Sequence, residues 1–179
     1  MAKALFMTDE EFRQLLEREI QFTAKLVKEV RPRDLPARFV VIGQTGEGQP
    51  NTTKAYGLNI PDEGEAKHKL FTELGARCYK EDKLAPLAAF ISIEAWVSRQ
   101  TGVQPREALD RQESVVVSGR TIDGRDCMGV SKIFRDTGSI IRLGNFEQTY
   151  HSTENFLLKA FFDSFMLTAF NDLKGKGVI

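Results

Sequence analysis

Two residues of one predicted strand combine a carboxylate with a large aromatic ring. Glu94 and Trp96 lie two positions apart in the apolar-rich segment 87–97, so an extended chain places both side chains on one face. A carboxylate beside an aromatic ring can have a raised pKa and act as an acid, or the ring can stack on a ring-shaped ligand. The alternative is a half-buried sheet face on which Glu94 forms an ion pair with an arginine.

A polar segment follows this strand and brings further charged groups. Residues 99–112 are expected to form a loop, and the next predicted strand begins at Glu113. Arg111 and Glu113 are therefore candidate ligand-binding residues together with Glu94 and Trp96. Charges of both signs are almost balanced over the wider region, which is typical of a solvated ion-pair surface but leaves an anion-binding site open.

The remaining reactive residues form no recognisable catalytic pattern. Cys78, Cys127 and the two histidines contain no close pair of metal ligands such as Cys-x-x-Cys, so no metal site is expected. Neither cysteine is placed beside a general base by a local motif. The glycine-rich segment 43–48 is followed by a predicted strand, whereas a phosphate-binding loop needs the start of a helix. No cofactor is predicted.

The composition is that of an ordinary globular domain. The chain has 179 residues, of which 41% are hydrophobic and 28% are charged, and this length fits a single domain spanning 1–179. Its 25 basic and 25 acidic side chains give no net charge that would attract nucleic acid or an anionic membrane. No apolar run suits a secretory signal or a membrane span, so a cytoplasmic location with reduced cysteines is expected.

Hydrophobic periodicity predicts three helices and six strands. The first helix is capped by Thr8 and ends before Pro32, the second covers about 62–80, and the last covers about 152–173 with Ser152 or Thr153 as its cap. The predicted strands are 37–43, 54–60, 87–97, 113–121, 127–135 and 139–143.

The turns between these segments indicate how the strands pair. Asp123-Gly124 and Thr137-Gly138 are favourable hairpin turns, so the sheet should be mostly antiparallel. The predicted fold is an α+β domain in which three helices pack on five to six strands, in the order α-β-β-α-β-β-β-β-α.

The last predicted helix is apolar almost all the way round. Such a helix is buried on two sides, and only one side can meet the sheet. The other side has three possible partners: the first helix, a second copy of the chain, or an apolar ligand in a cavity. Phe161, Phe162 and Phe165 are the candidate interface residues if the partner is a second copy.

One part of the sequence resembles uncharacterised small proteins of bacteria and phages. The similarity covers about 90–135 and is carried by Glu94-Ala95-Trp96, by Ala-Leu-Asp-Arg-Gln-Glu at 108–113 and by three valines at 115–117. It implies a bacterial or phage source but no particular activity.

Two functional hypotheses follow from the sequence. The first is a small cytoplasmic homodimeric interaction or accessory protein without catalytic activity, which could also bind another protein. The second is a small-ligand-binding protein or enzyme whose site lies on the Glu94/Trp96 face and is closed by the loop 99–112. Neither hypothesis involves a metal, nucleic acid or a membrane.

Overall fold

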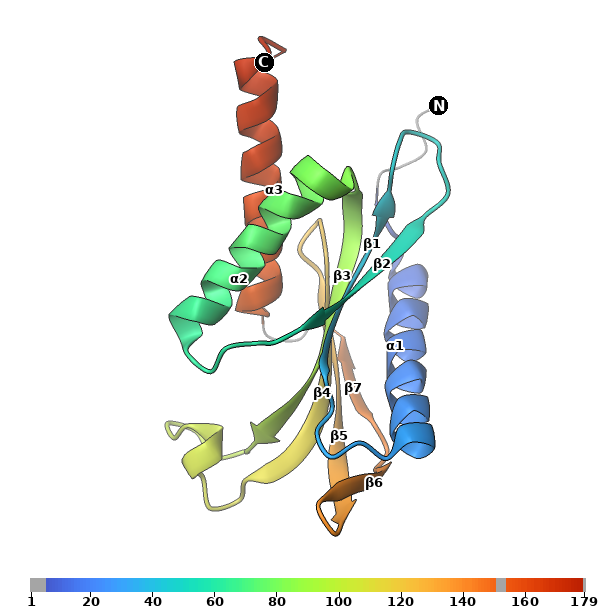
Figure 1. Ribbon diagram of the computed structural model, residues 1–179, viewed down its shortest axis with the longest axis vertical. Helices are drawn as coiled ribbons and strands as arrows, with labels where there is room; N and C mark the ends of the chain where they lie inside the picture. Colours follow the sequence, from blue (N-terminus) through green and yellow to red (C-terminus); the bar gives the residue numbers. More distant parts are fainter. Residues whose placement is uncertain (1–5, 151–153, 179) are drawn as a thin grey trace.

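One curled antiparallel sheet separates two layers of helices in the computed structural model, which describes residues 6–150 and 154–178 (Figure 1). Helix α1 (Asp9–Val30) lies on one face of the sheet, called here the α1 face. Helices α2 (Gly64–Arg77) and α3 (Phe156–Gly175) lie on the opposite face, called here the α2/α3 face. The α+β architecture predicted from the sequence is confirmed.

The sheet is built in the order β2-β1-β3-β4-β5, and every pairing in it is antiparallel. Beyond β5, two short strands share its free edge: β7 pairs with Cys127–Val130, and β6 pairs with Ile133–Asp136. The strands are β1 (Ala37–Gln44), β2 (Thr52–Leu58), β3 (Ala85–Val97), β4 (Gln112–Thr121), β5 (Asp126–Asp136), β6 (Ser139–Leu143) and β7 (Glu147–Tyr150). The sequence analysis missed β7, because its four residues are polar and show no apolar alternation.

Both predicted hairpin turns are present. Gly124 has φ of 88° and its N–H donates to the carbonyl of Thr121 over 3.0 Å, which closes the β4–β5 hairpin. Thr137 and Gly138 have φ of 48° and 87°, and they join β5 to β6. At Thr137-Gly138 two consecutive positive φ values match the right-handed twist of paired strands, whereas in the Asp123-Gly124 turn only Gly124 has a positive φ.

Helix α1 forms as its sequence predicts. The Thr8 side chain accepts the N–H of Glu11 over 3.2 Å, and the Glu11 carboxylate accepts the N–H of Thr8 over 2.8 Å, which completes a capping box. Its buried side chains repeat every three or four residues and pack onto the sheet: Phe12, Leu16, Ile20, Thr23 and Val27.

Helix α3 packs against α2 and not against the first helix, so that sequence-based alternative was wrong. Gly75 of α2 lies so close to α3 that an added Cβ would stand 2.2 Å from the carbonyl oxygen of Phe161. The side-chain oxygen of Asn155 caps α3 by accepting the N–H groups of Leu157 and Leu158, each over 3.1 Å. The helix therefore begins later than expected, and the caps proposed from the sequence, Ser152 and Thr153, lie outside the described residues.

Candidate functional site

The predicted site residues do share one face of the sheet. Glu94 and Trp96 of β3 lie on the α1 face, and Glu113 of β4 pairs directly with Trp96. Arg135 of β5 reaches the same place, beyond the end of α1. Arg135 is not one of the four site residues predicted from the sequence.

Arg135 holds the two carboxylates together. Its Nη2 lies 3.1 Å from Oε2 of Glu94 and 2.6 Å from Oε1 of Glu113, and its Nε donates to Oε2 of Glu113 over 2.9 Å. The ion pair considered from the sequence for Glu94 is therefore present. All three side chains are between one fifth and one third exposed, so solvent screens the pairs only in part.

The same cluster fixes the connection between α1 and β1. Oε1 of Glu94 accepts the N–H of Leu35, and Arg135 donates to the carbonyl of Arg33. Burial raises the pKa of Glu94, while the N–H of Leu35 and the Arg135 guanidinium oppose that rise. Both oxygens of Glu94 already have partners, so the role that the structure shows for this carboxylate is to hold the α1–β1 connection in place.

Trp96 and Arg111 form a separate contact. Trp96 is 46% exposed, and the guanidinium carbon of Arg111 lies 5.3 Å from the centre of its ring. Nη1 of Arg111 donates to the carbonyl of Arg106 over 2.6 Å, which holds the guanidinium within its own loop. A cation stacked on an exposed ring stabilises a loop by about 0.5–1 kcal/mol, so this contact is sufficient to account for both residues.

A groove of about 440 Å³ borders Glu94 on the side of β1 and β2. Its lining mixes apolar residues, such as Leu58, Ile93 and Leu157, with polar ones, and it comes from the segments next to β1 and β2, from β3, from α2 and from the start of α3. None of the other three predicted site residues lines it. The four predicted residues therefore do not converge on one cavity.

The loop 99–112 does border a cavity, but on the opposite face of the sheet. This cavity measures about 520 Å³ and lies where the sheet extends past α2 and α3, in the lower half of Figure 1. Ser98, Arg99 and Asp110 form one wall, and Lys132 and Glu147 stand on β5 and β7. Asp110 and Lys132 belong to the charged region considered from the sequence, whereas Glu147 lies on β7, which the sequence pattern does not predict.

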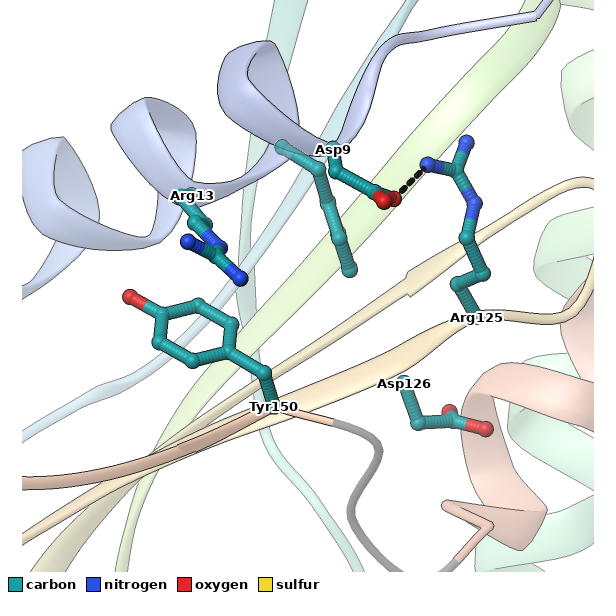
Figure 2. Close-up of a pocket in the computed structure, with 6 residues that line it drawn as sticks. Asp9, Arg13, Arg125, Asp126 and Tyr150 are labelled. Atoms are coloured by element: carbon teal, nitrogen blue, oxygen red, sulfur yellow. Dashed lines mark hydrogen bonds and ion pairs between the residues drawn. The ribbon is translucent and has the colours of Figure 1, made fainter.

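A small cavity of about 20 Å³ lies at the start of α1 (Figure 2). Asp9 pairs there with Arg125, and the Arg13 guanidinium stacks 4.7 Å above the ring of Tyr150. Asp126 points away from that pair in Figure 2, and its carboxylate lies 2.6 Å from Arg120. A space of this size holds at most a water molecule, so the charged groups form a structural junction between α1 and β5.

The two cysteines are buried in different cores. Cys78 packs with α2 and α3, whereas Cys127 packs on the α1 face, and both thiols are free. Burial raises the pKa of each thiol to about 12. The thiolate is therefore disfavoured at both positions, which argues against a nucleophilic role. His151, one of the two histidines, lies outside the described residues.

The three predicted interface residues of α3 lie inside the chain. Phe161, Phe162 and Phe165 are all buried, and Phe161 packs edge-on against Phe39 of β1 with ring centres 5.1 Å apart. These side chains hold α3 on the sheet and on α2. They cannot also form an exposed surface.

The exposed apolar surface of α3 lies further along the helix. In Figure 1 the C-terminal half of α3 continues past α2, and its large side chains there face solvent. These exposed residues are Met166, Leu167, Phe170 and Leu173, and they define what is called here the α3 stripe. The sequence showed that the helix had surplus apolar residues but not which of them α2 covers.

The described residues contain neither a group of metal ligands nor a membrane-spanning helix. Within residues 6–150 and 154–178, no group of three or more His, Cys, Asp and Glu side chains is arranged to hold a metal ion. In the same part of the chain, no helix is both long enough and apolar enough to cross a bilayer.

Comparison with known proteins adds no relative. No protein-family model, no curated protein and no solved structure matches this chain.

Proposed function

We propose that the protein acts by binding another protein chain, and that its first partner is a second copy of itself held through the α3 stripe. The observation that carries this proposal is the exposure of large apolar side chains along one side of α3. Phe170 is 53% exposed, and Met166 and Leu167 are exposed to a similar extent. Contiguous apolar surface of this kind marks interaction sites on soluble proteins.

The spacing of residues on α3 suits a helix as partner. Asp163, Leu167, Phe170 and Lys174 follow one another at steps of four, three and four, so they lie in one line along the helix. All four are exposed. An apolar centre flanked by one acid and one base is therefore presented to solvent.

Charge complementarity selects a second copy in antiparallel orientation. If the twofold axis passes between residues 168 and 169, Asp163 of one chain faces Lys174 of the other at both ends of the contact. Leu167 and Phe170 then meet each other across the axis. Asp163 also pairs with Lys159 on its own helix over 2.5 Å, which leaves its second oxygen for the partner.

A binding role also agrees with the contacts of Glu94 and with the raised pKa values of the two thiols, the groups that could have acted in catalysis. Glu94 is engaged by Arg135 and by the backbone of Leu35, and both thiols have raised pKa values. Two free, buried cysteines are compatible with a reducing compartment, which supports the cytoplasm as the proposed location. A bacterial or phage source remains part of this proposal on the sequence resemblance alone.

Light scattering during gel filtration tests the proposal. The wild-type chain should elute with twice the mass of one chain and dissociate on dilution, because one stripe buries less area than a permanent interface. Phe170→Ser should give single chains at every concentration. Phe6→Ser is the matched control, since Phe6 is 59% exposed but lies outside α3, and it should leave the mass unchanged. Single chains in the wild type would contradict the proposal.

A further inference from the structure

The cavity on the uncovered part of the α2/α3 face has the dimensions of a small-molecule site. Its volume of about 520 Å³ lies within the range of roughly 300–1,000 Å³ that is usual for ligand pockets. Hydrogen bonds fix one wall of it: the N–H of Gly144 donates to the carbonyl of Lys132 over 2.9 Å, and Oγ of Ser131 donates to the carbonyl of Gly144 over 2.8 Å. The β6–β7 connection is thus held against β5.

Four polar side chains around this cavity are left without polar partners. Arg99, Lys132, Asn145 and Glu147 line it, and among the described residues none of these side chains forms a hydrogen bond or an ion pair. Asp110 differs, because its carboxylate accepts from the hydroxyl of Ser98 and, over 3.0 Å, from the N–H of Arg99. All four side chains are exposed, so the cavity offers solvent two cations and one carboxylate that no ion pair within the described chain neutralises.

The sheet register keeps the opposite charges apart. Val130 pairs with Glu147, and Lys132 lies two positions further along β5 on the same face. The backbone positions of such diagonal neighbours are about 7–8 Å apart, a distance that long side chains can span. No ion pair joins Lys132 and Glu147 in the described part of the chain, so a ligand that carries both charges can bind between them.

Apolar groups complete the lining. Val97, Val130 and Phe134 also line the cavity, and the Lys132 ammonium sits 5.3 Å from the ring centre of Phe134. A ligand with an apolar side group therefore finds apolar contact area next to its charged groups.

We infer that this cavity binds an amino-acid-like zwitterion, a small molecule with a carboxylate and an ammonium group on the same carbon atom. Arg99 and Lys132 hold the carboxylate, Glu147 holds the ammonium, and Asn145 donates or accepts one further hydrogen bond. The side group of the ligand lies against Phe134 and Val130. This site does not involve α3, so it stands or fails independently of the proposed self-association.

Calorimetric titration with each of the free proteinogenic amino acids tests the inference. At least one of them should bind saturably with a dissociation constant below about 10 mM. The amide of that amino acid, which lacks the carboxylate, and its deaminated acid, which lacks the ammonium, should each bind at least about 10-fold more weakly. Absence of saturable binding by every amino acid overturns the inference, and so does equal binding by the two analogues.

Two variants locate the binding in this cavity. Lys132→Met and Glu147→Gln should each weaken binding about 10-fold or more, because each removes one charge-assisted hydrogen bond. Lys69→Met and Glu65→Gln are the matched controls, since both residues are exposed on α2 and do not line this cavity. Thermal unfolding of each variant verifies that it is folded. Binding that survives both cavity variants would place the ligand elsewhere and overturn the assignment.

Discussion

Helices α1 and α3 are similar in length, with 22 and 20 residues, but they use their apolar side chains differently. Helix α1 buries one stripe on the sheet, and the guanidinium of Arg38 covers the exposed ring of Phe22 at 4.0 Å. Helix α3 buries only the first half of its apolar residues, between the sheet and α2. The chain itself therefore accounts for the apolar pattern of α1, whereas the second half of α3 presents large apolar side chains that the rest of the described chain leaves exposed.

The largest expected effect separates the two halves of α3. Phe161→Ala should lower the free energy of unfolding by about 3–5 kcal/mol, because it leaves a cavity where a side chain was only 1% exposed. Phe170→Ala, studied at a concentration where the chains are separate, should change it by less than about 0.5 kcal/mol. Urea denaturation followed by circular dichroism measures both values. Equal losses would mean that the two halves of α3 do not differ in packing.

A smaller effect is expected where α3 rests on α2. Gly75→Ala should lower the free energy of unfolding by about 1–3 kcal/mol, since the new methyl group would meet the backbone of α3 at Phe161. Gly64→Ala is the control in the same helix, because nothing lies within 4 Å of its added methyl group. Denaturation midpoints compare the two, and a neutral Gly75→Ala would show that α3 is not seated as described.

The smallest effect concerns the segment that follows α1. Arg135→Met should lower the free energy of unfolding by about 1–2 kcal/mol at neutral pH, because it leaves Glu94 and Glu113 together without their cation. The cost is intermediate because all three side chains are partly exposed.

The stability lost in Arg135→Met should depend on pH, and the pKa of Glu94 determines in which direction. Burial already raises the pKa of Glu94 above the ordinary value of 4.5, and removal of Arg135 should raise it further. A carboxyl with a raised pKa in the folded state favours folding at low pH and loses that contribution as the pH rises. The deficit of Arg135→Met should therefore shrink on acidification through the raised pKa. Denaturation at a series of pH values measures it, and a deficit that grows on acidification would contradict the role of Glu94.

The fold could be predicted because most helices, strands and turns have a recognisable pattern in their own residues. The capping box at Thr8 and Glu11, the alternation in β3 and the turn at Gly124 each depend on neighbouring residues only. Strand β7 escaped prediction because its pairing with β5, and not its composition, makes it a strand.

The candidate site was less predictable, because its properties depend on residues far apart in the chain. The sequence showed that Glu94 and Trp96 share a face, but it did not show that Arg135 neutralises Glu94 while Arg111 stacks on Trp96. In α3, the two halves are similarly apolar in sequence, yet Phe161 is buried and Phe170 is exposed. Only the position of α2 distinguishes the two.

A charge exchange on α3 tests the account most directly. Asp163→Lys should place two lysines opposite each other in the antiparallel pair and give single chains in sedimentation equilibrium. The double variant Asp163→Lys, Lys174→Asp restores opposite charges at both ends, so it should recover the mass of two chains. Recovery in the double variant is the predicted result. A mass that stays the same in wild type, single variant and double variant would contradict self-association through the α3 stripe.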